Sequence, residues 1–449
     1  MRDSSAPCKL EDGCRIAVIG GGPAGSFFSY FLLDMARTVG LQVNLDLYEP
    51  RDFSVEGPAG CNMCGGIVSE SLVQALATEG IHLGPEIIQR TIDSYYLHMD
   101  VGGVTITTPR HEMRIASVHR GGGPRGSKSR HIGGLDGHLL HMAMEQGAHW
   151  RRARVSGIEF VDGLPQVTAE PGETREYDLV AGAVGVNSPA LKLFEACGIR
   201  YRPPAVVKTY ISEYLFSRSL IDREMGNAMH VFLLDLPGLE FAALVPKGDY
   251  VTLCVLGKDI NKKLIQDFVN SRVVREALPP NWEPPADPCH CSPRISVATA
   301  VAPYADRMVF VGDCGTTRLY KDGIGAAYRT AKAAAKTIVF HGFSERDFRQ
   351  HFWPVCRRLE QDNRIGKLVF AVTSQIQRRS FARRGLWRMV SQEQCVAGTT
   401  ARMSGVLWDT FTGSAPYSSV LLRTLHPMFI TRFLWALSVA NWNARGNKT

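Results

Sequence analysis

The sequence lacks the features that mark repetitive, fibrous and secreted proteins. Its 449 residues contain no low-complexity tract and no internal repeat, which excludes solenoid and collagen-like architectures. The first residues, MRDSSAPCKLEDGC, have no apolar segment, so we expect no secretory signal. The 11 cysteines are therefore expected to be reduced thiols of a cytoplasmic protein rather than a disulfide framework.

Acidic residues are scarce in the last part of the chain. From His341 onward there are 16 Lys and Arg against 6 Asp and Glu, an excess that exceeds the net charge of +8 for the whole chain. Residues 420–442, VLLRTLHPMFITRFLWALSVANW, lack the roughly 18 consecutive apolar residues that a spanning helix needs. Their mixture of large apolar and basic side chains is typical of a helix in the membrane interface, and equally of a terminal helix packed on the core. No nucleic-acid-reading module is visible, so we expect no nucleic acid partner.

Residues 15–51 carry the strongest motif, RIAVIGGGPAGSFFSYFLLDMARTVGLQVNLDLYEPR. Apolar residues predict a short strand at 15–19, a helix from 26 to 39 by their helical spacing, and a second strand at 43–48. The second strand ends at Glu49, an acid that can accept the hydroxyls of an adenosine ribose. This strand–helix–strand pattern predicts a dinucleotide-binding unit.

Three glycines join the first strand to the helix in a G-x-G-x-x-G pattern. Gly20 permits the tight turn, Gly22 lets the backbone approach a pyrophosphate, and Gly25 lets helix and strand pack closely. The N-terminus of the following helix offers N–H groups and a positive dipole end to the phosphates. The motif alone does not distinguish FAD from NAD.

A second feature favours a flavin. Residues 308–336, MVFVGDCGTTRLYKDGIGAAYRTAKAAAK, contain a strand that ends at Gly312-Asp313 and a glycine-containing loop before a helix. An acid at the end of the strand can hold a ribityl hydroxyl, and the helix N-terminus can face the flavin ring, where negative charge develops on reduction. A further strand, glycine turn and helix, YDLVAGAVGVNSPALKLF, occupies 177–194.

The order of these motifs resembles the FAD-dependent oxidoreductases of the p-hydroxybenzoate hydroxylase type over roughly residues 14–345. Residues 135–148, LDGHLLHMAMEQGA, are similar to the F-D-x-x-L helix of that superfamily. Within it, Cys64-Gly65-Gly66 is similar to the C-G-G motif of the geranylgeranyl reductases, flavoproteins that saturate isoprenoid double bonds. Val184 stands where the hydroxylases carry an Asp, which weakens the expectation of an NADPH-driven hydroxylase.

The resemblance implies FAD as the cofactor and an α/β fold with three parts. These are a Rossmann-like FAD-binding domain with a parallel sheet (14–90, 134–195 and 292–345), an inserted antiparallel-sheet substrate domain (91–133 and 196–291) and a helical C-terminal region (346–449). Alternating polar and apolar residues support the inserted sheet. The residues expected at the cofactor are Gly20, Gly22, Pro23, Ala24, Gly25, Glu49, Arg51, Cys64, Gly65, Gly66, Gly312, Asp313, Gly323, Ile324 and Gly325.

Cysteines gather in segments that we expect to border this site, namely Cys61, Cys64, Cys289, Cys291 and Cys314. One interpretation is a zinc or iron–sulfur site built from the C-x-x-C and C-H-C pairs. Another is a redox pair, Cys61 and Cys64, that exchanges electrons with the flavin. We favour a third, in which the thiols line the flavin and substrate pocket, and we therefore expect no metal.

The combined expectation is an FAD-dependent reductase that saturates double bonds of an isoprenoid or other long apolar substrate. A flavin hydride would add to one carbon, and a protein acid or water would protonate the other. Cys64 is the first candidate for the acid, followed by Cys61, Tyr320 and Lys321. The alternatives are a flavin monooxygenase or halogenase of an aromatic substrate, and an electron-transfer or redox-sensing flavoprotein that uses Cys61 and Cys64.

The electron donor stays open because no second G-x-G-x-x-G unit is visible. NAD(P)H, ferredoxin or a quinol could supply electrons, and a redox partner protein could deliver them. We expect a cytoplasmic protein that contacts a membrane surface through residues 420–442.

Overall fold

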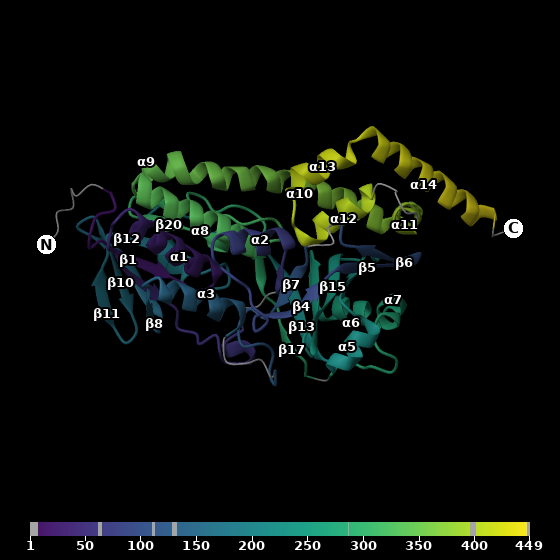
Figure 1. The fold of residues 1–449 in the computed structure, drawn as a ribbon, viewed down its shortest axis with the longest axis horizontal. Helices are drawn as coiled ribbons and strands as arrows, with labels where there is room; N and C mark the ends of the chain where they lie inside the picture. Colours follow the sequence, from purple (N-terminus) through teal and green to yellow (C-terminus); the bar gives the residue numbers. More distant parts are fainter. Residues whose placement is uncertain are drawn as a thin grey trace. The chain divides into compact units, whose positions relative to one another are not determined.

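The computed structural model describes residues 8–61, 65–109, 113–127, 133–285, 287–395 and 401–446. Two compact units are each assembled from three separate segments of the chain (Figure 1). The first unit comprises residues 1–62, 120–207 and 294–363, and the second comprises 63–119, 208–293 and 364–449.

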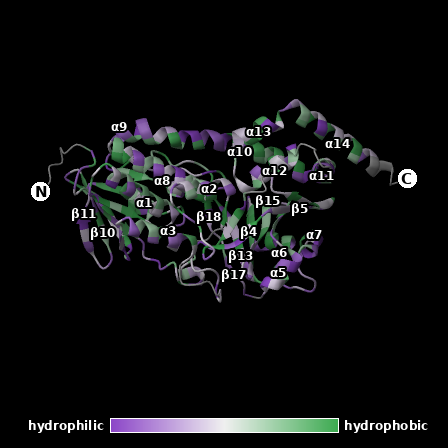
Figure 2. Ribbon diagram, in the orientation of Figure 1, coloured by the Kyte–Doolittle hydropathy of each residue, from purple (hydrophilic) through white to green (hydrophobic). Residues whose placement is uncertain are grey.

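A largely parallel six-stranded sheet forms the centre of the first unit, in the order β19-β20-β12-β1-β2-β8. Its inner strands are buried on both faces, which explains their nearly continuous apolar sequences (Figure 2). The α/β class with a parallel sheet is therefore confirmed. The strands are β1 (Arg15–Ile19), β2 (Asn44–Tyr48), β8 (His149–Arg151), β12 (Leu179–Gly182), β19 (Tyr304–Ala305) and β20 (Met308–Phe310).

Helices α1 (Pro23–Thr38) and α8 (Gly323–Phe340) pack against each other in the first unit. Phe27 and Phe31 of α1 meet the ring of Tyr328 on α8 at 5.8 and 5.6 Å between centroids. Helix α1 begins at Pro23, three residues before the predicted start, because proline suits the first helical position, where no N–H is needed.

Shorter elements complete the first unit. They include a small antiparallel sheet, β9–β10–β11, whose strands are adjacent in sequence. The remaining elements are η1 (Gly57–Ala59), α3 (Gly134–Glu145), β9 (Val155–Val161), β10 (Leu164–Ala169), β11 (Glu173–Glu176), α4 (Leu191–Ala196), β18 (Arg294–Ser296), η2 (Gly312–Cys314), α9 (Glu345–Asp347), η3 (Phe348–Phe352) and the first part of α10 (Trp353–Arg378).

The second unit is built on a larger sheet, in the order β17-β13-β16-β15-β14-β5-β6. Neighbouring strands are antiparallel as predicted, except that β14 runs parallel to β5. The strands are β5 (Ser94–Met99), β6 (Gly102–Thr107), β13 (Val206–Leu215), β14 (Ala228–Phe232), β15 (Leu239–Lys247), β16 (Tyr250–Gly257) and β17 (Cys289–Cys291). A smaller sheet, β3 (Ile67–Val68), β7 (Ile115–Val118) and β4 (Ile88–Ile92), lies beside α2 (Glu70–Thr78).

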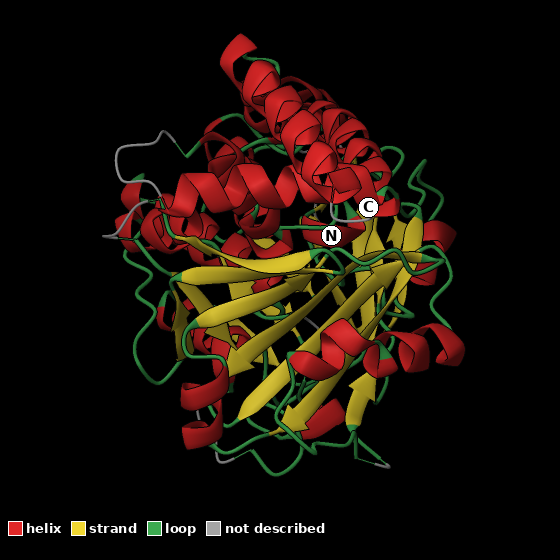
Figure 3. Ribbon diagram, turned by 90° about the vertical axis from the view of Figure 1, so that its right-hand side faces the viewer, coloured by secondary structure: helices red, strands yellow, loops and turns green. Residues whose placement is uncertain are grey.

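Helices cover both faces of the large sheet (Figure 3). On one face α5 (Arg218–Glu224), α6 (Lys262–Asn270) and α7 (Arg272–Glu276) form a core with Phe232, Leu244 and Val255. On the other face lie the C-terminal helices α11 (Ser380–Cys395), α12 (Arg402–Thr412), α13 (Tyr417–Thr424) and α14 (Pro427–Gly446).

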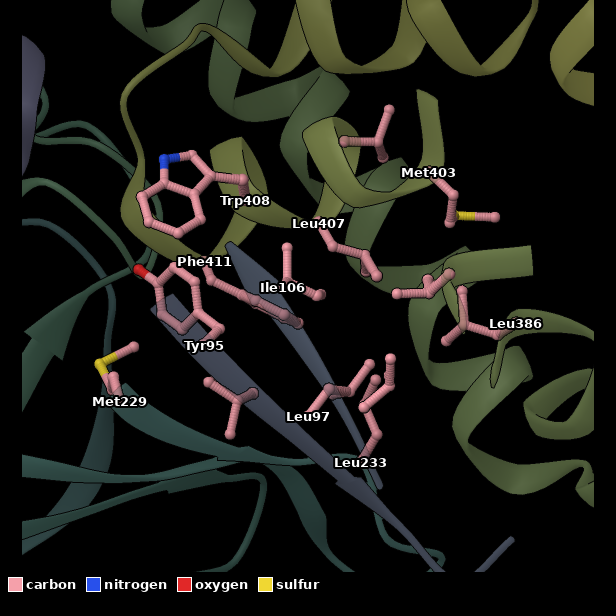
Figure 4. Close-up of a cluster of buried hydrophobic side chains, with 14 of the residues drawn as sticks. Tyr95, Leu97, Ile106, Met229, Leu233, Leu386, Met403, Leu407, Trp408 and Phe411 are labelled. Atoms are coloured by element: carbon pink, nitrogen blue, oxygen red, sulfur yellow. The ribbon is translucent and has the colours of Figure 1, made fainter. Parts of the chain in front are cut away.

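Figure 4 shows the core beneath these C-terminal helices, where Trp408 of α12 meets Tyr95 of β5. Their ring centroids are 4.8 Å apart with the edge of one ring toward the other. The indole N–H of Trp408 donates to the carboxylate of Glu70 at 2.9 Å, which satisfies a fully buried donor. Helices α11 to α14 are thus anchored on the large sheet of the second unit.

Residues 420–442 form two helices rather than one. Helix α13 ends at Thr424 and α14 starts at Pro427, because proline suits a helix start and disrupts a helix interior. Within the ranges that the structure describes, no helix is both long and apolar enough to cross a membrane.

Three histidines of the second unit are buried and neutral. His98 Nε2 and His230 Nδ1 lie 2.9 Å apart between adjacent strands. Burial lowers the pKa of His98 to about 3 and that of His230 to about 4. Burial, reinforced by the charge of Lys247, also lowers the pKa of His119 to about 3. Each imidazole resists protonation in the folded chain.

We predict that the second unit loses stability when the pH falls from 6.5 toward 4. In that window the unfolded chain binds protons at these histidines and the folded chain does not, so the free energy of unfolding falls by about 1.4 kcal/mol per pH unit for each histidine. Urea unfolding between pH 7.5 and 4.5 measures the slope. His119→Asn should remove about one histidine's share of this slope. The exposed His149→Asn should leave it unchanged, and equal slopes in both variants would contradict the assignment.

Candidate functional site

The glycine turn between β1 and α1 has no room for a side chain at Gly20 or Gly25. Gly20 has a φ of +106°, and a Cβ there would lie 2.6 Å from the carbonyl oxygen of Ala183. A Cβ at Gly25 would lie 1.9 Å from the carbonyl oxygen of Gly20. Gly22 caps α1 and Pro23 is its first residue, so the free end of this helix opens onto the turn. Such a concave backbone surface can accept a pyrophosphate.

Glu49 follows β2 directly and lies beside the glycine turn. Its carboxylate accepts the N–H of Gly21 at 3.0 Å, and the main-chain N–H and Nε of Arg51 at 3.0 Å each. The residue is 3% exposed, so its orientation is determined by these donors. An acid held here has the position that a ribose-binding acid takes in dinucleotide-binding folds.

The Gly312-Asp313 motif follows strand β20 and also lies against the N-terminal end of α1. Gly312 has a φ of +68°, and a Cβ there would lie 2.6 Å from the Cβ of Ala24. Its N–H donates to Thr330 Oγ1 on α8 at 3.0 Å. A Cβ at Gly323, the first residue of α8, would lie 3.7 Å from Asp313 Oδ1. The structure thus brings together three of the sequence motifs in one unit.

An ion pair that the sequence pattern did not reveal lies next to these motifs. Arg120 donates Nε to Asp136 Oδ1 at 2.5 Å and its second nitrogen to Oδ2 at 3.0 Å. The Asp136 side chain is fully buried and that of Arg120 is 12% exposed. Burial raises the pKa of Asp313, while the nearby Thr317 and the charge of Arg120 act to lower it. Arg120 is therefore close enough to influence the acid of the G-D motif.

A glycine-rich loop at residues 120–127 packs against residues 52–61 of the same unit. A Cβ at Gly121 would lie 2.1 Å from the carbonyl oxygen of Gly60, and one at Gly122 would lie 2.5 Å from that of Val55. The N–H of Gly57 donates to the carbonyl of Gly123 at 2.8 Å. Cys61 lies at the end of this packed region and is half-buried. The glycines of this loop therefore allow close contact between its backbone and that of residues 55–60.

The loop before α8 is held by helix α10. Asn363 accepts the N–H of Leu319 at 2.8 Å and donates to the carbonyl of Thr317 at 2.8 Å. The next two residues of this loop, Tyr320 and Lys321, are partly exposed, and Tyr320 has a left-handed φ of 61°. The sequence had no signal for Asn363, because its role depends on a contact 44 residues away along the chain.

Asp322 occupies the N-cap position of α8, and its carboxylate accepts hydrogen bonds from two arginines. Arg329 donates to its carboxylate at 2.6 Å and Arg318 at 3.5 Å. A Cβ at Gly325 would lie 2.1 Å from Asp322 Oδ1, so this glycine makes room for the carboxylate. Ile324, also predicted at the cofactor, is buried.

In the second unit, Gly65 and Gly66 lie over a polar patch of the large sheet. A Cβ at Gly65 would lie 3.0 Å from Cys254 Sγ, and one at Gly66 would lie 2.8 Å from Lys247 Nζ. Lys247 is 1% exposed, and its Nζ lies 4.0 Å from Glu213 Oε1. Cys64 lies outside the described residues, so its role stays a prediction.

Glu213 belongs to the same face of this sheet. It pairs across the strands with Thr252, whose hydroxyl donates to its carboxylate at 2.7 Å. Burial raises the pKa of Glu213, although the charge of Lys247 and the Thr252 hydrogen bond oppose the rise. The sequence pattern gave no signal for Glu213 or Lys247, because a lone acid in one strand and a lone base in another are ordinary surface residues until the strands pair.

The C-H-C motif forms strand β17, which separates its three side chains. Cys291 pairs with Ile211 and Cys289 with Glu213, so the two thiols share one face of the sheet. His290 pairs with Ser212 and points to the other face, where its ring stacks on Tyr210. Across the ranges that the structure describes, no group of three or more His, Cys, Asp or Glu side chains is arranged to hold a metal ion.

Comparisons with known proteins agree with the geometry of the first unit. A curated relative, geranylgeranyl diphosphate reductase from Synechocystis sp., is 25% identical over 354 residues, which cover 72% of this chain and 75% of the relative. The chain is an FAD-dependent oxidoreductase related to the geranylgeranyl reductases. No protein-family model matches it.

Solved structures share the fold of this oxidoreductase. A geranylgeranyl bacteriochlorophyll reductase-like protein from Thermoplasma acidophilum has a TM-score of 0.64 at 13% identity, and the match covers 92% of this chain and 99% of that one. A variant of the halogenase PltM in complex with FAD has a TM-score of 0.58 at 11% identity, with 97% and 92% covered.

The residues of the first unit fit FAD. The cradle that a Cβ at Gly20 or Gly25 would fill, together with the buried carboxylate of Glu49, would hold the adenosine diphosphate portion. Asp313 and the start of α8 at Gly323 would lie on the flavin side. FAD supplies hydride-transfer chemistry when bound.

We predict that Gly25→Ala abolishes FAD binding. The new Cβ would lie 1.9 Å from a backbone oxygen, so the turn must open. Flavin absorbance per mole of purified protein measures the loss. Gly405→Ala is the matched control, since its nearest neighbour, Arg423, lies 3.8 Å away and alanine favours the interior of a helix. Full flavin content in Gly25→Ala would contradict this view of the turn.

We predict that Asp136→Asn destabilises the first unit by about 3 kcal/mol, because it leaves the buried guanidinium of Arg120 without its counter-charge. Denaturant unfolding followed by flavin release measures the change. A matched substitution of an exposed ion pair, Glu276→Gln, should have a far smaller effect, because solvent screens that pair. Equal effects of the two substitutions would show that the Arg120 pair has no special role.

Proposed function

We propose that the oxidoreductase saturates carbon–carbon double bonds of an isoprenoid or another long apolar molecule. The observation that carries this proposal is the position of Gly65-Gly66, the glycines of the reductase-like motif, against Lys247 and Cys254 on the large sheet. The 25% identity to a geranylgeranyl diphosphate reductase supports it. The apolar Ile211, between Cys254 and Cys291 in the same row of the sheet, gives this face a surface suited to an apolar chain.

We propose Glu213 as the acid that protonates the substrate carbon. An isolated alkene has no carbonyl to stabilise charge, so the site must hold a proton donor in a dry environment. Glu213 has this environment, since burial favours its protonated form and Thr252 orients its carboxyl group. The earlier candidates Cys64, Cys61, Tyr320 and Lys321 stay predictions beside it.

The alternatives concern other reactions of the same cofactor. The likeness to a halogenase extends to the fold alone, and monooxygenase or halogenase activity on an aromatic substrate stays a prediction. Electron transfer or redox sensing through Cys61 and Cys64 stays one as well. The electron donor, whether NAD(P)H, ferredoxin or a quinol, is open.

The proposal is tested with anaerobic, fully reduced protein. Geranylgeranyl diphosphate should reoxidise the flavin and yield a product that is two mass units heavier for each bond saturated. Reoxidation only by oxygen with an aromatic substrate would favour the monooxygenase or halogenase. Reoxidation only by a protein acceptor would favour electron transfer. Either result would contradict the reductase.

The variant Glu213→Gln tests the proton donor independently of FAD binding. We expect an unchanged flavin content and a reoxidation rate about a hundredfold lower, because the carboxamide cannot donate the proton. The control is Glu159→Gln on strand β9, where the side chain is exposed. A wild-type rate in Glu213→Gln would reject Glu213 as the acid, and substrate turnover by that variant would still support the reductase.

A further inference from the structure

The last two helices present large apolar side chains to solvent. Leu422 on α13 is 69% exposed, and Trp435 and Trp442 on α14 are 66% and 81% exposed. The C-terminal apolar surface, as we name it, consists of Leu422, Leu425, Met428, Ile430, Leu434, Trp435 and Trp442. Single exposed apolar residues are ordinary, but seven of them on two successive helices and the turn between them are more than chance scatter and indicate an interaction site.

The opposite side of α14 is already packed within the second unit. Phe429 and Ala436 are buried there. Leu437 lies so close to α11 that a Cβ at Gly385 would be 2.4 Å from its Cδ2. Asn441 accepts two hydrogen bonds from Arg384, at 3.0 and 2.8 Å. Among the residues that the structure describes, only this inner side of α14 packs, while large apolar side chains on its outer side stay exposed, which favours a partner there.

Charge identifies the partner. After Asp409 the sequence contains no Asp or Glu, while it contains Arg423, Arg432, Arg445 and Lys448. Asp409 itself is paired with Arg423. The segment that carries the apolar surface therefore has a positive net charge, which suits an anionic surface.

Two exposed arginines extend the positive charge to the far end of α14. Arg378, the last residue of α10, and Arg379, which precedes α11, are exposed near Phe381, which is 45% exposed. The side chain of Asn441 donates to the carbonyl of Phe381 at 3.2 Å, so this basic corner lies beside Trp442. Tryptophan and arginine together are the side chains that favour the headgroup region of a bilayer.

We propose that the C-terminal apolar surface docks on an anionic lipid bilayer without crossing it. Two copies joined through this surface would bring like charges together, which disfavours self-association. In the bilayer, the tryptophans and leucines would enter the headgroup–acyl boundary while the arginines contact lipid phosphates. Docking concerns a surface other than the proposed reaction site and does not depend on the substrate.

Vesicle sedimentation of the full-length FAD-loaded protein tests the proposal. The protein should bind phosphatidylcholine vesicles that contain phosphatidylglycerol, and it should bind neutral phosphatidylcholine vesicles at least tenfold more weakly. The double variant Leu434→Glu/Trp435→Glu should lose binding at least tenfold while keeping its flavin content. The matched control is Val301→Glu in the first unit, an apolar residue that is 60% exposed, and it should bind like the wild type.

A second variant examines charge. Arg378→Glu/Arg379→Glu should weaken binding to the anionic vesicles several-fold and reduce its dependence on salt. Wild-type binding by the Leu434→Glu/Trp435→Glu variant would overturn the proposal. So would light scattering that shows a wild-type dimer, dissociated by the same substitutions, together with no vesicle binding. Both measurements are independent of whether the protein reduces geranylgeranyl diphosphate, so failure of the docking proposal is distinguishable from failure of the proposed function.

Discussion

The site of the first unit depends on one close backbone contact, in which Gly25 lies directly against the carbonyl oxygen of Gly20. Because neither position has room for a side chain, the start of α1 can lie against the end of β1 and turn its N-terminus outward. Gly312 makes the third such contact, against Ala24. If these close backbone contacts were lost, Glu49 and Asp313 would no longer lie near the same end of α1. A dinucleotide could then no longer contact all three features at once.

Each unit also contains a buried charged pair, and the two pairs are matched in different ways. Arg120 and Asp136 form a bidentate pair in which both carboxylate oxygens accept a hydrogen bond from the guanidinium. Lys247 and Glu213 are 4.0 Å apart, so their pairing is looser and burial raises the pKa of the carboxyl. A fully matched pair stabilises structure, whereas in the looser pair burial still raises the pKa of the carboxyl group and favours its protonated form. This difference distinguishes a positioning arginine from a candidate acid.

The motifs that the sequence predicted correctly are local. The strand at 15–19 agrees with β1, and the G-x-G-x-x-G turn and the strand at 308–310 lie where the pattern indicated them. Such features depend on a few neighbouring residues, so the spacing of glycines and the runs of apolar residues predict them directly. Residues 420–442 were the harder case, since apolar content alone does not show that Pro427 starts a new helix or which side of α14 packs.

By itself, the sequence determined the dinucleotide-binding unit, because its turns and buried strands need particular residues at fixed spacing. The resemblance of its motifs to a known family indicated the whole fold class, the flavin cofactor and the group of enzymes to which this oxidoreductase is related. Tertiary structure decided which distant side chains meet. Arg120 finds Asp136, Asn363 holds Leu319, and Glu213 comes beside Lys247 only when the strands and helices pack. It also separated His290 from Cys289 and Cys291, since alternate residues of a strand point to opposite faces.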